Sequence, residues 1–334
     1  MTGMEMRAAR IVQPGGVEVL EVQKVAKPQP GVSDVLVRVH ASALNRADIL
    51  QRRGKYPAPR GVHPDIPGME FAGEVEACGS LVSLWKAGDR VMGLVGGGAH
   101  AEYVVAHERT LAEIPSHLSW EEAAAIPEAF ITAHDALWIQ AGLRPNERVL
   151  IHAVGSGVGL AATQIAHAMN ALSSGTSRTA DKLQRARAYG LDSGFAISGN
   201  PTAEDGQQWA AGGAFDVVLD LVGGPYTNAS LHALAPKGRI ILIGTMGGAR
   251  GELDLGLMLG RRARLVGTVL RSRPLEEKIS VTLSFAREVL PLFARGILRP
   301  VIDSVFDLSD IGRAHDRMES NETFGKVILR VAKP

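Results

Sequence analysis

The chain has 334 residues, of which 46% are hydrophobic and 21% are charged, and its formal net charge is +1. This length predicts two domains, and the near-neutral charge argues against nucleic acid or an anionic membrane as a partner. The single cysteine, Cys78, excludes an intrachain disulfide framework and any multi-cysteine zinc site. Residues 1–10 carry no apolar core of signal-peptide length, and no apolar run is long enough to span a membrane, so we expect a soluble cytoplasmic protein.

The first third of the chain predicts an irregular antiparallel β domain, either a barrel or a sandwich. Short β-branched or alternating runs recur there between glycines and prolines. The predicted strands cover residues 35–40, 71–77, 89–95, 100–106 and 110–114. Ser119 followed by Glu122 then predicts a helix that begins with a capping box. A second helix is predicted over residues 131–141, stopped by Gly142.

From Val149 onward, strand and helix patterns alternate. The predicted strands are 149–154, 171–176, 195–197, 215–221, 239–244 and 264–270, with helices at 157–169, 181–189, 225–234 and 255–261. This alternation predicts right-handed βαβ units and a doubly wound parallel sheet of six strands, which is the Rossmann dinucleotide-binding fold. A long helix at 275–293, a short helix at 310–319 and a final strand at 326–331 are expected to return to the first domain.

A glycine-rich turn joins the first strand and helix of the alternating region. Read from Ala153 the pattern is A-x-G-x-G-x-G, a variant of the dinucleotide-binding turn. Glycines allow backbone N–H groups to approach a pyrophosphate, and the helix N-terminus stabilises its charge. Gly157 and Gly159 are the candidates for the phosphate turn and the helix–strand contact, within the cofactor-binding run Ser156, Gly157, Val158, Gly159. The alternative is a purely structural βα turn.

The residues after the next predicted strand indicate which dinucleotide binds. An NAD site of this fold carries Asp or Glu about 20 residues past the glycines, but residues 160–180 contain no carboxylate. Ser177, Arg178 and Lys182 stand there instead, and hydroxyls and cations suit the 2′-phosphate of NADPH. We therefore expect NADPH as the cofactor. The alternative, that the two cations are merely solvated, is weakened because cations are unfavourable near a helix N-terminus.

Several stretches of the sequence match those of a known family and occur in the same order as in that family. They are residues 42–48, 54–56, 124–133, 150–153, 156–159, 246–248 and 270–273. With these stretches the chain resembles the zinc-free quinone oxidoreductases of the medium-chain dehydrogenase/reductase superfamily, relatives of zeta-crystallin. The resemblance implies a GroES-like catalytic domain (1–128 and 273–334), a Rossmann NADPH-binding domain (129–272) and a cleft between them. It also implies a homodimer or tetramer joined through the last parallel strand, 264–270.

Members of the superfamily differ in whether they contain a catalytic zinc. Zinc members place Cys near Asn45 and His within a Gly-His-Glu motif, where this chain has Gly68, Met69 and Glu70. An amide and a thioether are poor zinc ligands, so no metal is expected.

The resemblance also assigns site residues in the first domain. It puts Asn45 beside the nicotinamide and the substrate carbonyl, although Asn is also a common turn residue. Asp48 either orients Asn45 or caps a helix. Tyr56 either supplies a hydroxyl to the substrate or is a surface aromatic. These three are the catalytic candidates.

The remaining cofactor assignments come from the resemblance and from the strand ends. Thr132 would touch the nicotinamide end, unless its hydroxyl bonds its own helix. Strand ends at Gly244, Thr245, Met246 and at Thr268, Val269, Leu270 lie where such sheets bind ligands. The family holds the 2′-phosphate with Ser, Lys and Tyr; Ser177 and Lys182 match the first two, while Ile197 stands at the Tyr position and Arg178 would compensate. Lys326 is either a phosphate contact or a solvated charge, and the solvated alternative is preferred.

Three functions follow in order of preference. The first is an NADPH-dependent, zinc-independent quinone reductase that acts on a small-molecule quinone. The second is an enoyl-thioester or alkenal double-bond reductase with Tyr56 as proton donor. The third is a cofactor-binding protein with a structural or RNA-binding role, which the lack of a basic stripe disfavours.

Overall fold

The computed structural model describes residues 4–332 of the chain. They divide into two compact units, one of Met1–Ile131 with Leu270–Pro334 and the other of Thr132–Val269. Helix α3 (Pro127–His134) crosses the boundary and continues as a π-helical turn, Asp135–Gln140. The helix therefore begins four residues earlier than predicted, because Pro127 is well placed at a helix start, where no intrahelical N–H bond is needed.

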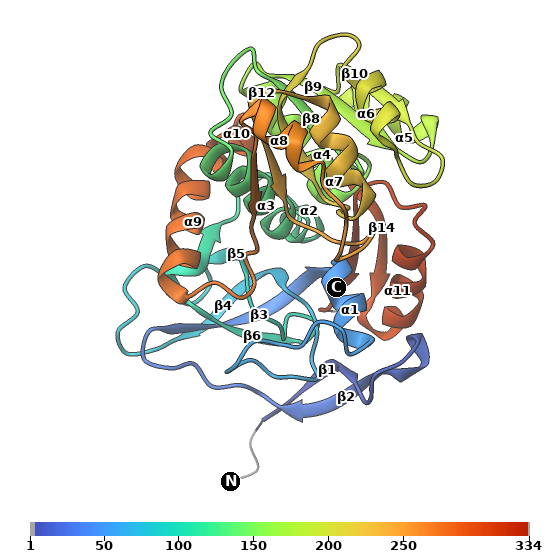
Figure 1. The fold of residues 1–334 in the computed structure, drawn as a ribbon. Coiled ribbons are helices and arrows are strands. Elements are labelled where there is room, and N and C mark those ends of the chain that lie inside the picture. Colours follow the sequence, from blue (N-terminus) through green and yellow to red (C-terminus); the bar gives the residue numbers. More distant parts are fainter. Residues whose placement is uncertain (1–3, 333–334) are drawn as a thin grey trace. The chain divides into compact units, whose positions relative to one another are not determined.

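The second unit is built on one parallel sheet of six strands (Figure 1). Its strands are β8 (Arg148–Ile151), β9 (Leu172–Ser177), β10 (Ser193–Ala196), β11 (Phe215–Asp220), β12 (Leu234–Leu242) and β13 (Arg264–Gly267). They pair in the order β10-β9-β8-β11-β12-β13. In chain order this is 3-2-1-4-5-6, the Rossmann arrangement, so the predicted doubly wound sheet is confirmed.

The helices of the second unit follow the predicted positions with one addition. They are α4 (Gly157–Ala168), α5 (Ala180–Ala186), α6 (Ala203–Trp209), α7 (Pro225–Ala233) and α8 (Leu255–Arg261). Helix α6 was not predicted, because its sequence is mostly polar and contains Gly206. That glycine allows close packing on α7, since an added Cβ would lie 2.0 Å from the carbonyl oxygen of Ala229. Trp209 at the end of α6 is buried in the core.

The first unit holds a largely antiparallel sheet, as predicted. Its strands are β3 (Asp34–Ala43), β4 (Glu70–Cys78), β5 (Arg90–Leu94), β6 (Tyr103–His107), β7 (Leu111–Glu113), β14 (Ile302–Asp307) and β15 (Lys326–Arg330). They follow the order β14-β15-β3-β4-β5-β7, with β6 also paired to β3. A separate hairpin joins β1 (Glu5–Ile11) to β2 (Leu20–Ala26). The last segment of the chain returns to this unit, because Ile328 of β15 pairs with Ala43 of β3.

Helices of the first unit are α1 (Arg46–Arg52), α2 (Trp120–Ala124), α9 (Leu275–Glu288), α10 (Leu290–Ala294) and α11 (Ile311–Glu319). The capping box predicted at Ser119 and Glu122 is present at the start of α2. The single helix predicted over 275–293 is wrong. It breaks at Val289 into α9 and α10, because Pro291 has no N–H to continue the helical ladder.

Candidate active site and cofactor turn

Asp48 completes the capping box at the start of helix α1, where Asn45 is the N-cap. Its carboxylate accepts the N–H of Asn45 at 2.7 Å and that of Gly68 at 2.9 Å, and it lies 3.8 Å from the His100 ring. Burial of Asp48 would raise its pKa, but the His100 interaction and the Asn45 N–H outweigh burial, and the pKa is lowered. Of the two roles considered for Asp48, the structure shows capping, which also fixes where Asn45 sits at the end of β3.

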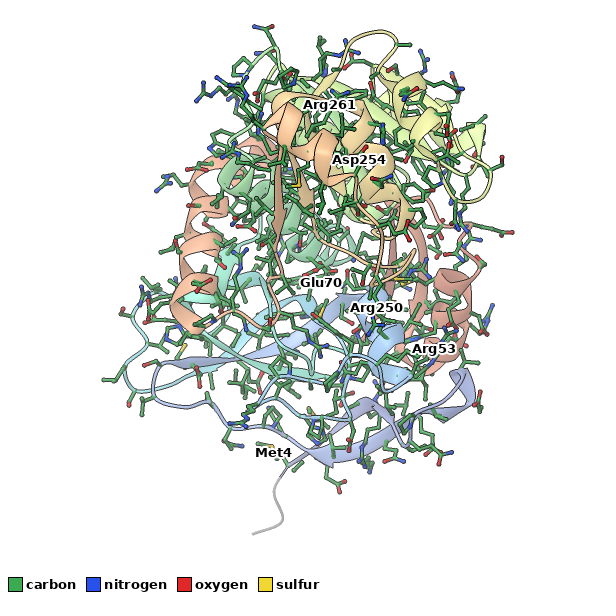
Figure 2. All side chains as sticks on the ribbon, viewed as in Figure 1. Met4, Arg53, Glu70, Arg250, Asp254 and Arg261 are labelled. Atoms are coloured by element: carbon green, nitrogen blue, oxygen red, sulfur yellow. The ribbon has the colours of Figure 1, made fainter. Side chains whose placement is uncertain are left out.

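The side chain of Asn45 is held by a buried ion pair. Its Nδ2 donates to Glu70 Oε1 at 2.8 Å, and its Oδ1 accepts from Lys326 Nζ at 2.7 Å. Lys326 Nζ lies 2.6 Å from the same Glu70 oxygen, and Glu70, labelled in Figure 2, is fully buried. Lys326 also donates to the carbonyl of Leu44, so all three of its protons are used. The expectation that Lys326 is solvated is wrong: it is 5% exposed.

The residues of this network also determine whether a metal ion fits at the same position. A zinc site needs three or more good N, S or O ligands, whereas the groups here are an amide, the Met69 thioether and a carboxylate already paired with an ammonium. Across residues 4–332, no three His, Cys, Asp or Glu side chains are grouped so as to hold a metal ion. The residues at this position do not fit a zinc ion.

Tyr56 lies beneath a buried guanidinium that the sequence reasoning did not assign to the site. The Arg271 guanidinium carbon is 4.9 Å from the centre of the Tyr56 ring, a cation–π contact. Arg271 is 7% exposed and donates to the Gly96 carbonyl at 2.7 Å and to Gln51 Oε1 at 2.6 Å. Burial raises the pKa of the half-buried Tyr56 hydroxyl, and the Arg271 charge partly opposes that rise. The only sequence signal for Arg271 was its place in the 270–273 stretch.

The glycine-rich turn of the second unit has the geometry of a dinucleotide site. Ala153 after β8 has a φ of 48°, so the strand ends earlier than predicted and the chain turns. Ser156 caps α4, its hydroxyl accepting the Gly159 N–H at 3.1 Å. A Cβ at Gly159 would lie 2.6 Å from the Ala153 carbonyl oxygen, so this position needs glycine. The turn and the first N–H groups of α4 fit a pyrophosphate.

The cations predicted to bind a 2′-phosphate lie at the end of β9 and in α5. Ser177 is the buried last residue of β9, and Arg178 next to it is exposed. The Lys182 side chain crosses the turn, because a Cβ at Gly155 would lie 2.9 Å from Lys182 Cδ. Tyr226, at the start of α7, also belongs here: burial raises its pKa, and the nearby Arg178 charge opposes the rise. No spacing rule in the sequence pointed to Tyr226.

Ile197 is placed differently from its assignment. It is 6% exposed and packs in a core cluster with Trp209 and Phe215. Its aliphatic side chain offers no hydrogen bond to a phosphate, and its N–H donates to the Ser177 carbonyl. The structure therefore brings a tyrosine to Arg178 from α7 rather than from residue 197.

Most of the other assigned cofactor residues fall at strand ends or beside them, whereas Thr132 lies in helix α3. Gly244 follows β12, and a Cβ added at this glycine would lie 2.5 Å from the Leu221 carbonyl oxygen. Met246 is 52% exposed. Thr268 follows the short strand β13 and donates its hydroxyl to Asp135 at 3.3 Å. Residues Thr132, Gly244, Thr245, Met246, Thr268 and Val269 belong to the second unit, and Leu270 to the first. The ends of β12 and β13 belong to the carboxyl edge of the sheet, where ligands of this fold bind.

Comparisons with known proteins agree with both units. Residues 31–116 match the model of the alcohol dehydrogenase GroES-like domain, and residues 191–329 match a model described as zinc-binding dehydrogenase. The chain is 33% identical to the quinone oxidoreductase of Lama guanicoe, with 97% of each chain covered. It is 34% identical to the quinone oxidoreductase of Pseudomonas aeruginosa, covering 94% of this chain and 96% of that one.

Solved structures are similar over the same length. The CurK enoyl reductase has a TM-score of 0.85 at 27% identity, and a mycobacterial protein solved in complex with NADPH has 0.85 at 28%; each comparison covers 98% of this chain and all of the other. Within the described part of the chain, no helix combines the length and apolarity needed to cross a bilayer. The chain belongs to the medium-chain dehydrogenase/reductase superfamily, among its zeta-crystallin-like quinone oxidoreductases.

Proposed function

We propose that the protein is an NADPH-dependent quinone reductase that works without zinc. The observation that carries the zinc-free part is the Lys326 ammonium, 2.6 Å from Glu70. A protein cation there neutralises the buried carboxylate beside Met69, at the place that zinc members give to the metal. Near-full-length similarity to quinone oxidoreductases supports the acceptor class.

The second unit supplies the cofactor part of this proposal. The bound dinucleotide supplies a hydride from its nicotinamide. Ser156 and Gly159 shape the turn that receives the pyrophosphate, and Lys182 lies across that turn. Arg178 and Tyr226 stand together where a charged group and a hydroxyl suit a 2′-phosphate. A similar structure holds NADPH, which supports the same cofactor here.

The first unit positions the acceptor rather than activating it chemically. Quinone reduction forms an aromatic product, so the acceptor needs little help from an acid. Both polar atoms of the Asn45 amide are bonded to Glu70 or Lys326. Because these bonds hold the amide rigidly, it presents a fixed surface that positions the bound reactants.

Stopped-flow absorbance at 340 nm under anaerobic conditions tests the proposal. NADPH mixed with enzyme and simple benzoquinones or naphthoquinones should be oxidised, and chelator-dialysed enzyme should retain full activity. Stoichiometric zinc whose removal abolishes activity would contradict the zinc-free part. No NADPH oxidation with any quinone would contradict the acceptor class.

A double-bond reductase is the second candidate, favoured by Tyr56. Its hydroxyl is protonated at neutral pH, as a proton donor to a carbanion-like carbon requires, and the CurK enoyl reductase shares the fold. Tyr56→Phe distinguishes the two: a large loss of rate with enoyl substrates and little loss with quinones favours this candidate.

We also propose that two copies associate through β13. It is the edge strand of the second unit's sheet, and Leu265 on it is exposed, as are Leu255 and Leu259 of α8. An exposed edge strand pairs readily with another strand. Sedimentation equilibrium should give a dimer or tetramer, and Leu265→Lys should shift it toward monomer.

A further inference from the structure

A small pocket in the first unit has more positive than negative side chains in its wall. It is lined mainly by apolar side chains such as Met69 and Leu94, together with Glu128, Arg271 and Lys278. Its volume is about 30 Å³. A space of this size admits one or two waters, or one small substituent such as a carboxylate, but not an aromatic ring.

Two of the three charges on the wall are cations. Arg271 donates to the Gly96 carbonyl and to Gln51. Burial lowers its pKa, and the charges of Asp48, Tyr56 and Glu128 partly oppose that shift. The ammonium of Lys278, by contrast, has no carboxylate partner among residues 4–332.

The half-buried Lys278 is in an unfavourable place for a cation. Burial lowers its pKa, and the neighbouring Arg271 charge lowers it further. It also lies in the first turn of α9, where the helix dipole disfavours positive charge. A half-buried cation without a counter-ion loses part of its solvation, and an anion beside it restores part of that loss. This unmatched charge points to a ligand with a carboxylate, and the apolar lining strengthens the attraction between the two charges.

We propose that this pocket binds a carboxylate, held by Lys278 with Arg271 beside it. This deepens the proposed function and rests on it for the reaction: the acceptors used best are quinones or enones that carry a carboxylate substituent. The carboxylate enters the pocket, and the ring stays outside it. Lys278 is thus a specificity-determining residue that selects anionic acceptors over neutral ones of the same shape.

Binding without turnover tests the pocket by itself. Calorimetry compares benzoate with benzamide, which has the same shape and no charge, on wild-type protein without cofactor. We expect benzoate to bind more tightly, to weaken with added NaCl, and to lose about tenfold or more in affinity in Lys278→Met. Lys278→Arg, which keeps the charge, should retain benzoate binding. Lys86→Met, at a side chain 86% exposed, is the matched control and should change nothing.

Three results would overturn the proposal. One is equal affinity for benzoate and benzamide in the wild type, which needs no variant to fold. Another is equal benzoate affinity in wild type and Lys278→Met. The last is an equal loss in Lys86→Met, which would show general attraction to a charged surface.

A kinetic comparison separates this inference from the proposed function. With a quinone carboxylate and its methyl ester as acceptors, Lys278→Met should raise KM for the carboxylate and leave that of the ester unchanged. If neither acceptor is reduced while Lys278-dependent benzoate binding persists, the proposed function fails and the pocket assignment stands. If both are reduced with no effect of Lys278→Met, the pocket assignment fails alone.

Discussion

The buried ion pair beside Asn45 in the first unit is satisfied internally, whereas the glycine-rich turn of the second unit has the geometry of a ligand site. Every proton of the Lys326 ammonium has a partner in Leu44, Asn45 or Glu70. In the second unit, the first N–H groups of α4 have no carbonyl of their own helix to bind, and Arg178 is exposed beside Tyr226. The first unit therefore keeps one rigid arrangement, while the turn of the second unit presents N–H groups that suit a bound anion.

The largest effect should come from breaking the buried pair. Lys326→Met leaves the fully buried Glu70 carboxylate without its cation, and we expect the free energy of unfolding to fall by about 3–5 kcal/mol. Urea unfolding at pH 7 measures it. Adding Glu70→Gln should recover part of the loss. Lys24→Met breaks an exposed pair with Glu5 and should change stability by less than about 1 kcal/mol; equal losses in the two lysine variants would contradict the contrast.

Arg178→Ala tests whether the second unit contacts the 2′-phosphate of the dinucleotide. Loss of a charge-assisted contact worth about 1.5–3 kcal/mol should weaken NADPH binding by roughly 10- to 100-fold and leave NADH binding nearly unchanged. Fluorescence titration with each dinucleotide gives the two Kd values. Tyr226→Phe should weaken NADPH by less, because only one hydroxyl is lost. Equal weakening of both dinucleotides would show that Arg178 does not contact the 2′-phosphate.

Gly159→Ala tests the turn itself. The added Cβ meets the Ala153 carbonyl at 2.6 Å, so the backbone must shift, and we expect a loss of about 1–3 kcal/mol in stability with weaker binding of both dinucleotides. Gly260→Ala in α8 is the control: its Cβ meets nothing within 4 Å, and alanine favours a helix. Thermal unfolding should order the variants Gly260→Ala, wild type, Gly159→Ala from most to least stable. A stable Gly159→Ala would contradict the close approach.

The remaining prediction is a pH dependence in the second unit. Burial lowers the pKa of His152 to about 4, and its ring nitrogens lie 2.9 Å from Thr176 Oγ1 and 2.7 Å from Ser230 Oγ. Between pH 6.5 and 4 the unfolded chain binds a proton that the folded chain does not, so stability is full above 6.5 and falls with falling pH by about 1.4 kcal/mol per unit.

His152→Gln measures that contribution. His315 in the first unit, with its pKa lowered by burial to about 3, titrates in the same direction in both proteins. Unfolding series from pH 4.5 to 7 should therefore give a shallower slope in the variant than in the wild type. Parallel slopes would show that His152 is protonated in the folded state.

Local features of the sequence determined most of the fold. The change from alternating β patterns to regular strand–helix alternation marked the Rossmann sheet, because side-chain period reports directly on secondary structure. The capping box at Ser119 and Glu122 and the close approach at Gly159 were visible for the same reason, since each depends on residues within a few positions. The polar helix α6 was not predicted from the sequence, because it is stabilised by packing through Gly206 and Trp209 rather than marked by a hydrophobic periodicity.

The partners within each site were decided only by the tertiary structure. Sequence spacing contains no information that Lys326 of β15 would reach Glu70 of β4, because that contact depends on which strands are neighbours of β3. Likewise Ile197 lies in the core rather than at the phosphate, and Tyr226 lies near Arg178, since both placements depend on how β10, α6 and α7 pack. Arg271 and Lys278 share a pocket with Met69 and Glu128 for the same physical reason: residues far apart in sequence come together only when the sheet and its helices have formed.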